Sequence, residues 1–223
     1  MNIDELIRKV EKDPRFLKLK NVIENNSYHD HQKVYDHSML VLKVAKEKIT
    51  GDFIQNEEAK ELFKKFVEDK FDGDLARKDC MLLAALLHDL GKAGYYRDGE
   101  NERSVLHTNS KGQTSCPGHE YISSILVPDL LKGSISEKEI AYVSQIIKLH
   151  GSIKDESLSV MKTWEFEDVL DNIKSESEGL YIESLFNIYC DVYYAQASSD
   201  LREMAVKIFN SPDFYTKRTY YLK

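Results

Sequence analysis

The chain has 223 residues, of which 42% are hydrophobic, and a formal net charge of −7. This composition excludes a disordered chain, and the acidic balance argues against an extended nucleic-acid surface, which needs a basic footprint. With only 4 Pro and 10 Gly, the sequence favours an all-α fold over a sandwich that needs many tight turns. We expect a single domain over residues 1–223.

Cysteines and apolar runs indicate the compartment. Cys80, Cys116 and Cys190 are far apart and odd in number, so they predict neither a disulfide framework nor a Cys-x-x-Cys zinc site. The first twelve residues are charged throughout, unlike a signal peptide. The longest apolar run, residues 81–87, is too short to span a bilayer. We therefore expect a cytoplasmic protein with no membrane contact.

Apolar residues recur at helical spacing along most of the chain. In chain order, this spacing predicts helices over 2–12, 32–49, 57–70, 75–90, 118–131, 136–149, about 178–200 and 201–210, with a short helix near 164–173. The segment 75–90 is apolar nearly all round, which is typical of a helix in the middle of a core. Gly91 is expected to cap that helix at its C-terminus.

Residues 92–117 break the helical pattern. They are rich in Gly, Ser, Thr, Asn and charged residues, and a loop of this length in a compact domain is usually functional or mobile. Lys111-Gly112 could turn a small hairpin. We expect at most this one short β-hairpin, near residues 105–116.

Metal-binding types of residue are attached to the apolar helices, often at their ends. The set contains four histidines and two aspartates: His37, His88, Asp89, His119, His150 and Asp191. Imidazole and carboxylate without thiolate suit iron, zinc, manganese or nickel, and a structural zinc site is disfavoured. A single histidine at a helix end is usually a cap. A buried His-Asp pair after an apolar run is harder to explain without a ligand, because burying such groups unpaired is costly.

The local sequences around these residues resemble a known family. LLAALLHDLGKAG (residues 82–94), DHSMLVLKVA (36–45) and the later Asp191 are similar to the HD superfamily of metal-dependent phosphohydrolases. The resemblance implies an all-α helical bundle with a core over about 35–196. It also implies two divalent metal ions, from among Fe, Mn, Ni, Zn and Mg. One would be held by His37, His88, Asp89 and Asp191, and the second by His119 and His150, with Asp89 bridging.

A narrower resemblance covers two segments. NSKGQTSCPGHEYIS (109–123) and CDVYYAQ (190–196) are similar to parts of the HD region of bacterial tRNA nucleotidyltransferases. The chain departs from that group, because no Gly-Gly pair precedes an Asp-x-Asp strand and Pro117 stands where an aromatic residue is common. The resemblance is therefore to a stand-alone relative of the HD part.

The resemblance implies hydrolysis by a metal-activated water of a phosphomonoester or phosphodiester, in a nucleotide or nucleotide end. Asp89 and Lys92 are the candidate catalytic residues, and Lys92 and Arg97 the candidate contacts to a small phosphorylated substrate. Lys92 could instead pair with Asp98 or Glu100 and only close the loop. HD-fold diiron oxygenases such as myo-inositol oxygenase use the same four-His, two-Asp set, so the ligands alone do not separate the two activities. A non-catalytic nucleotide-binding module is disfavoured, since every expected ligand is present.

Three other histidines carry weaker signals. His29 and His31 form a His-x-His pair without strand context, and we expect them at a rim or in solvent. His107 is expected to be an exposed loop residue. Glu120 could orient a metal ligand, but His119-Glu120 is not a metalloprotease motif, because no second histidine follows four residues later.

Overall fold

Helices make up most of the structure. The computed structural model describes residues 2–70, 73–98, 101–152, 164–195 and 198–215, with backbone only for 95–98 and 101–103. The predicted all-α class is confirmed. The α-helices are α1 (Ile3–Glu11), α2 (Pro14–Leu17), α3 (Val34–Lys48), α4 (Glu57–Glu68), α5 (Arg77–Leu87), α6 (His119–Leu131), α7 (Glu137–Lys148), α9 (Phe166–Glu176), α10 (Tyr181–Asp191) and α11 (Ser199–Phe209). Short 3-10 turns are η1 (Lys18–Asn21), η2 (Leu90–Ala93) and η4 (Pro212–Phe214).

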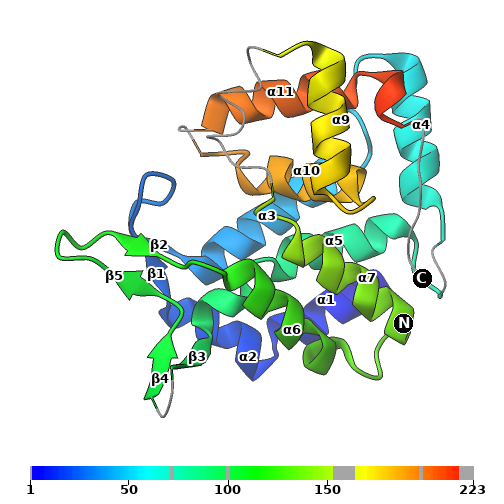
Figure 1. Cartoon of the computed structure of the whole chain (residues 1–223). Helices are drawn as coiled ribbons and strands as arrows, with labels where there is room; N and C mark the ends of the chain where they lie inside the picture. Colours follow the sequence, from blue (N-terminus) through cyan, green and yellow to red (C-terminus); the bar gives the residue numbers. More distant parts are fainter. Residues whose placement is uncertain (1, 71–72, 99–100, 153–163, 196–197, 216–223) are drawn as a thin grey trace.

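The central helix is α5, as its all-round apolar sequence predicts. Every residue from Cys80 to Leu87 is buried, and the helix contacts α3, α4, α7 and α10. In Figure 1, α1, α2 and α6 lie below α5, whereas α4, α9 and α11 lie above it. One hydrophobic cluster includes residues from α1 to η4. Among the described residues, none of the helices combines the length and the apolar character that a transmembrane span requires.

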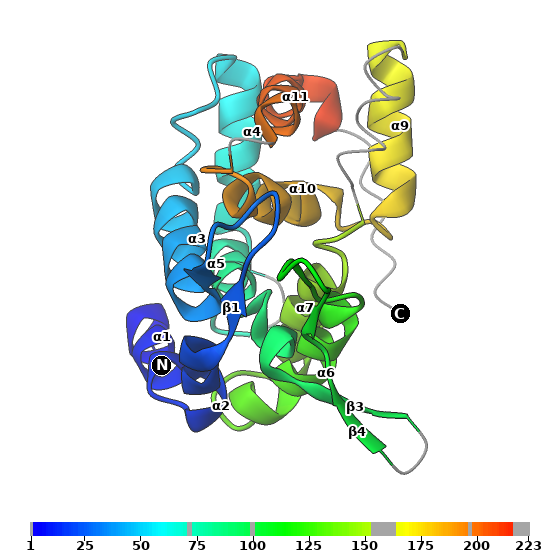
Figure 2. The ribbon, with the colours of Figure 1, turned by 90° about the vertical axis from the view of Figure 1, so that its left-hand side faces the viewer.

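Three antiparallel hairpins extend from the helices on one side of the molecule (Figures 1 and 2). The predicted hairpin near 105–116 is found as β5 (His107–Thr108) paired with β6 (Thr114–Ser115). The expectation of no further hairpin was wrong, because β1 (Ile23–Glu24) pairs with β2 (Gln32–Lys33), and β3 (Tyr95–Asp98) pairs with β4 (Asn101–Ser104). Strands of two to four residues are too short to show a period in the sequence.

The predicted helix over 178–200 is interrupted. Helix α10 ends at Asp191, and α11 begins only at Ser199. The Arg202 guanidinium of α11 reaches back to the carbonyl groups of Val192 and Ala195 and stabilises the intervening turn. A side chain that binds carbonyls seven and ten residues earlier leaves no trace in local periodicity. The interruption places Asp191 at a helix end.

Gly91 does not cap α5 as predicted. The α-helix ends at Leu87, and Gly91 lies in η2, where it meets the first turn of α6. A Cβ added there would lie 2.6 Å from the backbone nitrogen of Ser123 and would also collide with the His119 carbonyl oxygen. The Gly91 amide donates to Ser123 Oγ at 2.7 Å. The glycine is therefore required by the close approach of η2 to α6.

Replacing Gly91 with alanine tests this packing. We expect Gly91→Ala to lower the free energy of unfolding by about 2–3 kcal/mol, because the added methyl group meets rigid backbone. The comparison is Gly112→Ala, where an added Cβ meets nothing within 4 Å and only the positive φ of 76° opposes it. That variant should lose about 1 kcal/mol. Equal losses in urea unfolding would contradict the proposed collision.

Candidate metal centre

The six predicted ligands come together at the ends of five different helices. His37 lies in α3, and His88 and Asp89 follow directly after α5. His119 is the first residue of α6, His150 follows α7, and Asp191 is the last residue of α10. His37, His88, Asp89 and His150 are buried, whereas the His119 and Asp191 side chains are 16% and 26% exposed. The helices therefore deliver imidazole and carboxylate groups to one buried position with an opening on one side.

The first group of potential ligand atoms surrounds Asp191 and one oxygen of Asp89. His37 Nε2 lies 2.7 Å from Asp191 Oδ1, and His88 Nε2 lies 3.4 Å from the same oxygen. Asp89 Oδ2 is 3.2 Å from His88 Nε2 and 3.7 Å from His37 Nε2. His37, His88 and Asp89 each offer one atom within 4.8 Å of the others, so they could hold one metal ion together.

The second group uses the other oxygen of Asp89. His119 Nε2 lies 3.2 Å from Asp89 Oδ1 and 3.2 Å from His150 Nε2. Asp89, His119 and His150 again offer ligand atoms within 4.8 Å of one another. Asp89 is the residue common to both groups, which is the position expected of a carboxylate that bridges two metal ions.

Backbone carbonyl groups orient three of the four imidazole rings. Each ring donates its Nδ1–H to the residue three positions earlier: His88 to Ala85 at 2.9 Å, His119 to Cys116 at 2.7 Å and His150 to Ile147 at 2.6 Å. A carbonyl oxygen can only accept, so Nδ1 carries a proton and Nε2 is the ring atom that faces the centre, where a metal ion would displace any proton held on it. This outer hydrogen bond is the usual arrangement for a metal-binding histidine.

The buried atoms at the centre lack ordinary hydrogen-bond partners. His88 Nε2 and both carboxylate oxygens of Asp89 are fully buried and accept or donate no hydrogen bond with acceptable geometry. The Asp89 oxygens have only ion-pair neighbours, Lys92 at 2.9 Å and His88 and His119 at 3.2 Å, whereas buried polar atoms usually make well-aligned hydrogen bonds. A cation coordinated by these atoms would satisfy all three, so the donor set fits a divalent metal.

Burial and neighbouring charges shift the pKa of His88 and that of His150 in opposite directions. Burial disfavours a charged His88, but the neighbouring Asp89 and Asp191 outweigh it and raise the pKa of this ring to about 10. Burial, together with the nearby His88 and His119, lowers the pKa of His150 to about 3. The adjacent His88 holds the pKa of Asp89 and of Asp191 well below the usual range despite burial. The two carboxylates are therefore ionised and attract positive charge.

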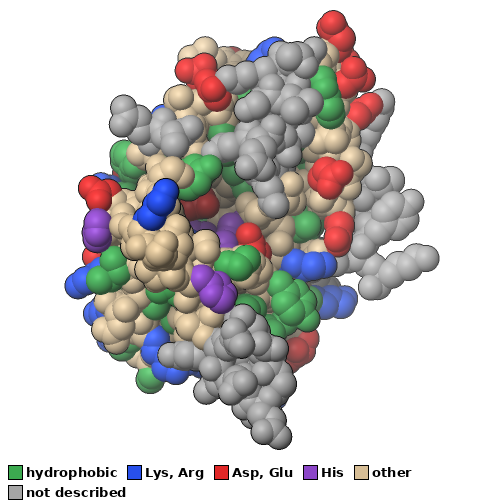
Figure 3. Space-filling model, turned by 60° about the vertical axis from the view of Figure 1, so that its left-hand side comes forward, with side chains coloured by type: hydrophobic (Ala, Val, Ile, Leu, Met, Phe, Trp, Pro, Cys, Tyr) green, Lys and Arg blue, Asp and Glu red, His purple; other side chains and the backbone are tan. Residues whose placement is uncertain are grey.

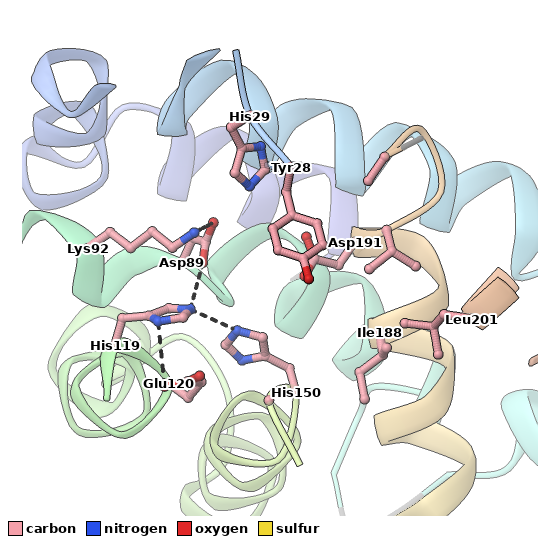
Figure 4. Close-up of a pocket in the computed structure, with 13 residues that line it drawn as sticks. Tyr28, His29, Asp89, Lys92, His119, Glu120, His150, Ile188, Asp191 and Leu201 are labelled. Atoms are coloured by element: carbon pink, nitrogen blue, oxygen red, sulfur yellow. Dashed lines mark hydrogen bonds and ion pairs between the residues drawn. The ribbon is translucent and has the colours of Figure 1, made fainter. Parts of the chain in front are cut away.

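A cavity of about 300 Å³ opens beside the centre. Figure 3 shows a hollow on this face in which histidine and acidic side chains are visible. Metal-site residues, Lys92 and the apolar side chains of Ile188, Val192 and Leu201 line it. In the close-up, Ile188 and Leu201 lie across the cavity from His119 and Lys92 (Figure 4). The cavity therefore has one charged wall and one apolar wall.

Lys92 lies at the charged wall, but its partner differs from those predicted. The side chain is only 7% exposed, and Nζ is 2.7 Å from Glu24 Oε2 and 2.9 Å from Asp89 Oδ2. Of the partners considered from the sequence, the side chain of Asp98 and the whole of Glu100 lie outside the described part of the structure. Arg97 lies in β3, and its side chain is likewise outside the described residues.

Sequence reasoning missed Glu24 and undervalued His29. The hairpin formed by β1 and β2 turns both side chains toward the interior. Glu24 is 3% exposed, and His29 lines the cavity with its ring 4.6 Å from that of His37. The neighbouring His31 is exposed, as expected, and so is His107. Glu120 also lines the cavity, 3.5 Å from His119 Nδ1. No local signal marks Glu24, since its position depends on a hairpin that periodicity does not reveal.

Comparison with known proteins identifies the family. The model of the HD domain family matches residues 34–197, which include all six predicted ligands. No curated protein and no solved structure matches the chain. The narrower similarity to the HD region of tRNA nucleotidyltransferases stays a prediction. Because the match covers well over half of the chain, the protein belongs to the HD domain family.

Proposed function

We propose that the protein is a metal-dependent phosphohydrolase that cleaves a phosphomonoester or phosphodiester in a nucleotide or nucleotide end. The HD family implies a metal-dependent hydrolase, and the His and Asp groups could hold metal. The observation that carries the proposal is the sharing of Asp89 by two ligand groups beside a cationic side chain in a small cavity. Two divalent ions bound there would activate water and neutralise charge on phosphoryl oxygens.

The charge of the cavity supports a need for two metal ions. Glu24, Asp89, Glu120 and Asp191 contribute four carboxylates at or beside the cavity, against the one ammonium of Lys92. With neutral imidazoles, the formal charge is −3, which would repel a phosphate. Two divalent cations would change it to +1. An anionic substrate is therefore compatible with this site only when both metal ions are held.

The two walls of the cavity suit the two ends of a phosphoester. The Lys92 ammonium would contact a phosphoryl oxygen at the charged wall, which His119 and His150 also line. Ile188 and Leu201 offer an apolar surface to the organic part. A volume of about 300 Å³ matches a small molecule or the end of a chain, and the net charge of −7 likewise disfavours a long nucleic-acid substrate.

A substrate screen tests this function. Nucleoside monophosphates, 2′,3′-cyclic nucleotides and aryl phosphates would be offered with Mn²⁺, Fe²⁺, Ni²⁺ or Mg²⁺, and we expect at least one clear turnover. Chelation should abolish it and re-addition of metal should restore it. If none of these substrates is hydrolysed and the iron-loaded protein takes up oxygen, the result would favour the oxygenase alternative.

Replacing Lys92 with methionine tests its role toward substrate. We expect kcat/KM to fall by about tenfold or more while metal content is unchanged, because a charge-assisted contact to the transition state is lost and no ligand is removed. The melting temperature should also fall, since Glu24 would stay buried without its cation. If the folded fraction of Lys92→Met keeps wild-type kcat/KM, Lys92 has only a structural role.

A further inference from the structure

The first strand turns its charged residue inward and its apolar residue outward. In β1, Ile23 is 46% exposed, whereas Glu24 is 3% exposed. Successive strand residues face opposite sides, so a shift of one residue would bury the isoleucine and expose the glutamate. Hydrophobic burial favours that alternative, and a buried carboxylate is unfavourable unless it is paired. The observed register therefore requires a partner for Glu24 inside the protein.

That partner is Lys92. Glu24 Oε2 lies 2.7 Å from Lys92 Nζ, and the ammonium is held between this carboxylate and Asp89 Oδ2 at 2.9 Å. His29 Nε2, from the same hairpin, lies 3.6 Å from Glu24 Oε2. In Figure 4 the Lys92 side chain extends along the cavity wall and ends beside Asp89. Glu24 thus fixes one side of an ammonium whose other side faces the carboxylate shared by both ligand groups.

The hairpin that carries Glu24 is firmly anchored. Asn25 and Thr114 of β6 exchange two hydrogen bonds of 2.8 Å each, and the Asn25 side chain donates to the Gly112 carbonyl at 3.1 Å. At the tip, Asn26 Oδ1 accepts from the amides of Tyr28 and His29. Strand β6 leads directly to the predicted ligand His119, so the two hairpins place groups on the same wall.

This hairpin lies outside the segment that identifies the family. The family match begins at residue 34, whereas β1, the turn and β2 span residues 23–33. Tyr28 and His29 from the turn line the same cavity as Lys92 and Asp89. A segment preceding the family match therefore completes part of the wall of the candidate site.

We propose that Glu24 is a positioning residue that holds the Lys92 ammonium against Asp89, and that the β1–β2 hairpin serves to bring this carboxylate to the site. Glu24 touches no reacting group and acts through Lys92. The catalytic consequence rests on the proposed function, whereas the placement of Lys92 by Glu24 does not.

Kinetics of four variants test the catalytic consequence: Glu24→Gln, Lys92→Met, the double variant and the control Asp30→Asn. The control makes the same type of change in the same hairpin, at a side chain that is fully exposed. With a phosphoester that the wild type hydrolyses, Glu24→Gln should lower kcat by about tenfold with KM within about twofold. The double variant should be no slower than Lys92→Met alone. Multiplied losses in the double variant, or wild-type kinetics of Glu24→Gln, would overturn the proposal.

Lysine acetylation followed by mass spectrometry tests the placement without any substrate. In metal-loaded protein, Lys92 should be acetylated at least about fivefold faster in Glu24→Gln than in wild type or Asp30→Asn, while the half-exposed Lys64 reacts equally in all three. If Glu24→Gln does not fold, Glu24→Asp, which keeps the charge but shortens the reach, should give an intermediate rate. An unchanged rate at Lys92 would refute the placement. If the wild type hydrolyses no phosphoester, the proposed function fails separately and this measurement still decides the inference.

Discussion

An Asp89→Ala variant is expected to lose hydrolysis by at least about 10³-fold, more than the loss of a single transition-state donor produces. It should also lose metal from both groups, because Asp89 offers one oxygen to each. Metal content is measured by elemental analysis of the purified protein, beside the turnover assay. Retention of full metal content by this variant would contradict a shared carboxylate.

Two comparison variants sharpen this result. Asp191 contacts His37 and His88 and belongs only to the first group, so Asp191→Ala should lose one metal equivalent and keep the other. Lys60 is remote from the centre and pairs with Asp52, so Lys60→Ala should change neither metal content nor activity. We therefore expect Asp89→Ala to lose two equivalents of metal, Asp191→Ala to lose one and Lys60→Ala to lose none. This series is specific to a centre in which Asp89 bridges.

The second large effect is expected on stability. Glu183, fully buried in α10, accepts a hydrogen bond of 2.5 Å from the Tyr142 hydroxyl and lies 3.6 Å from the Arg77 guanidinium. Arg77 in turn donates to Tyr142 at 3.1 Å. Burial, followed by the charge of Glu183, raises the pKa of Tyr142 well above its usual value, so the tyrosine stays a neutral donor. This network joins α5, α7 and α10, three of the helices whose ends carry the predicted ligands.

Glu183→Ala should lower the free energy of unfolding by about 3–5 kcal/mol, because it removes one of the two carboxylates that pair with the buried Arg77, the other being Asp69, and also the acceptor of the Tyr142 hydroxyl. For a chain of this size the melting temperature should fall by roughly 6–20 °C. Glu178→Ala is the matched control, since that carboxylate is 58% exposed and pairs with Lys148 at the surface. The control should cost about 1 kcal/mol or less. Similar losses for the two variants would show that the buried network does not stabilise the fold.

The sequence predicts those parts of the fold that depend on local pattern. Helices such as α7 follow from apolar spacing and from the capping box of Ser136 and Glu139, which the structure contains. The burial of α5 follows from its all-round apolar sequence. The end of α10 at Asp191 does not follow, because the turn is stabilised by Arg202 from the next helix. Helical period alone cannot register such a tertiary contact.

The candidate site likewise contains residues that the local sequence predicts and residues that depend on tertiary contacts. The His-Asp pair at 88–89 follows an apolar helix, so its unusual burial can be expected from the sequence, and the structure brings the six predicted ligands together. Their metal binding stays a prediction. Glu24 could not be expected, because its burial depends on a two-residue strand paired across a turn and on a lysine 68 positions later. Gly91 was expected to act locally, whereas its role is the approach of α6.

Metal stoichiometry and turnover, measured on one anaerobic sample, test the two-metal hydrolase most directly. Protein loaded with Mn²⁺ or Fe²⁺ would be desalted, analysed for metal, and assayed for phosphoester hydrolysis with and without oxygen. The account predicts two equivalents of metal per chain and the same rate of hydrolysis in both atmospheres. One equivalent or none in active protein, or turnover that requires and consumes oxygen, would contradict it.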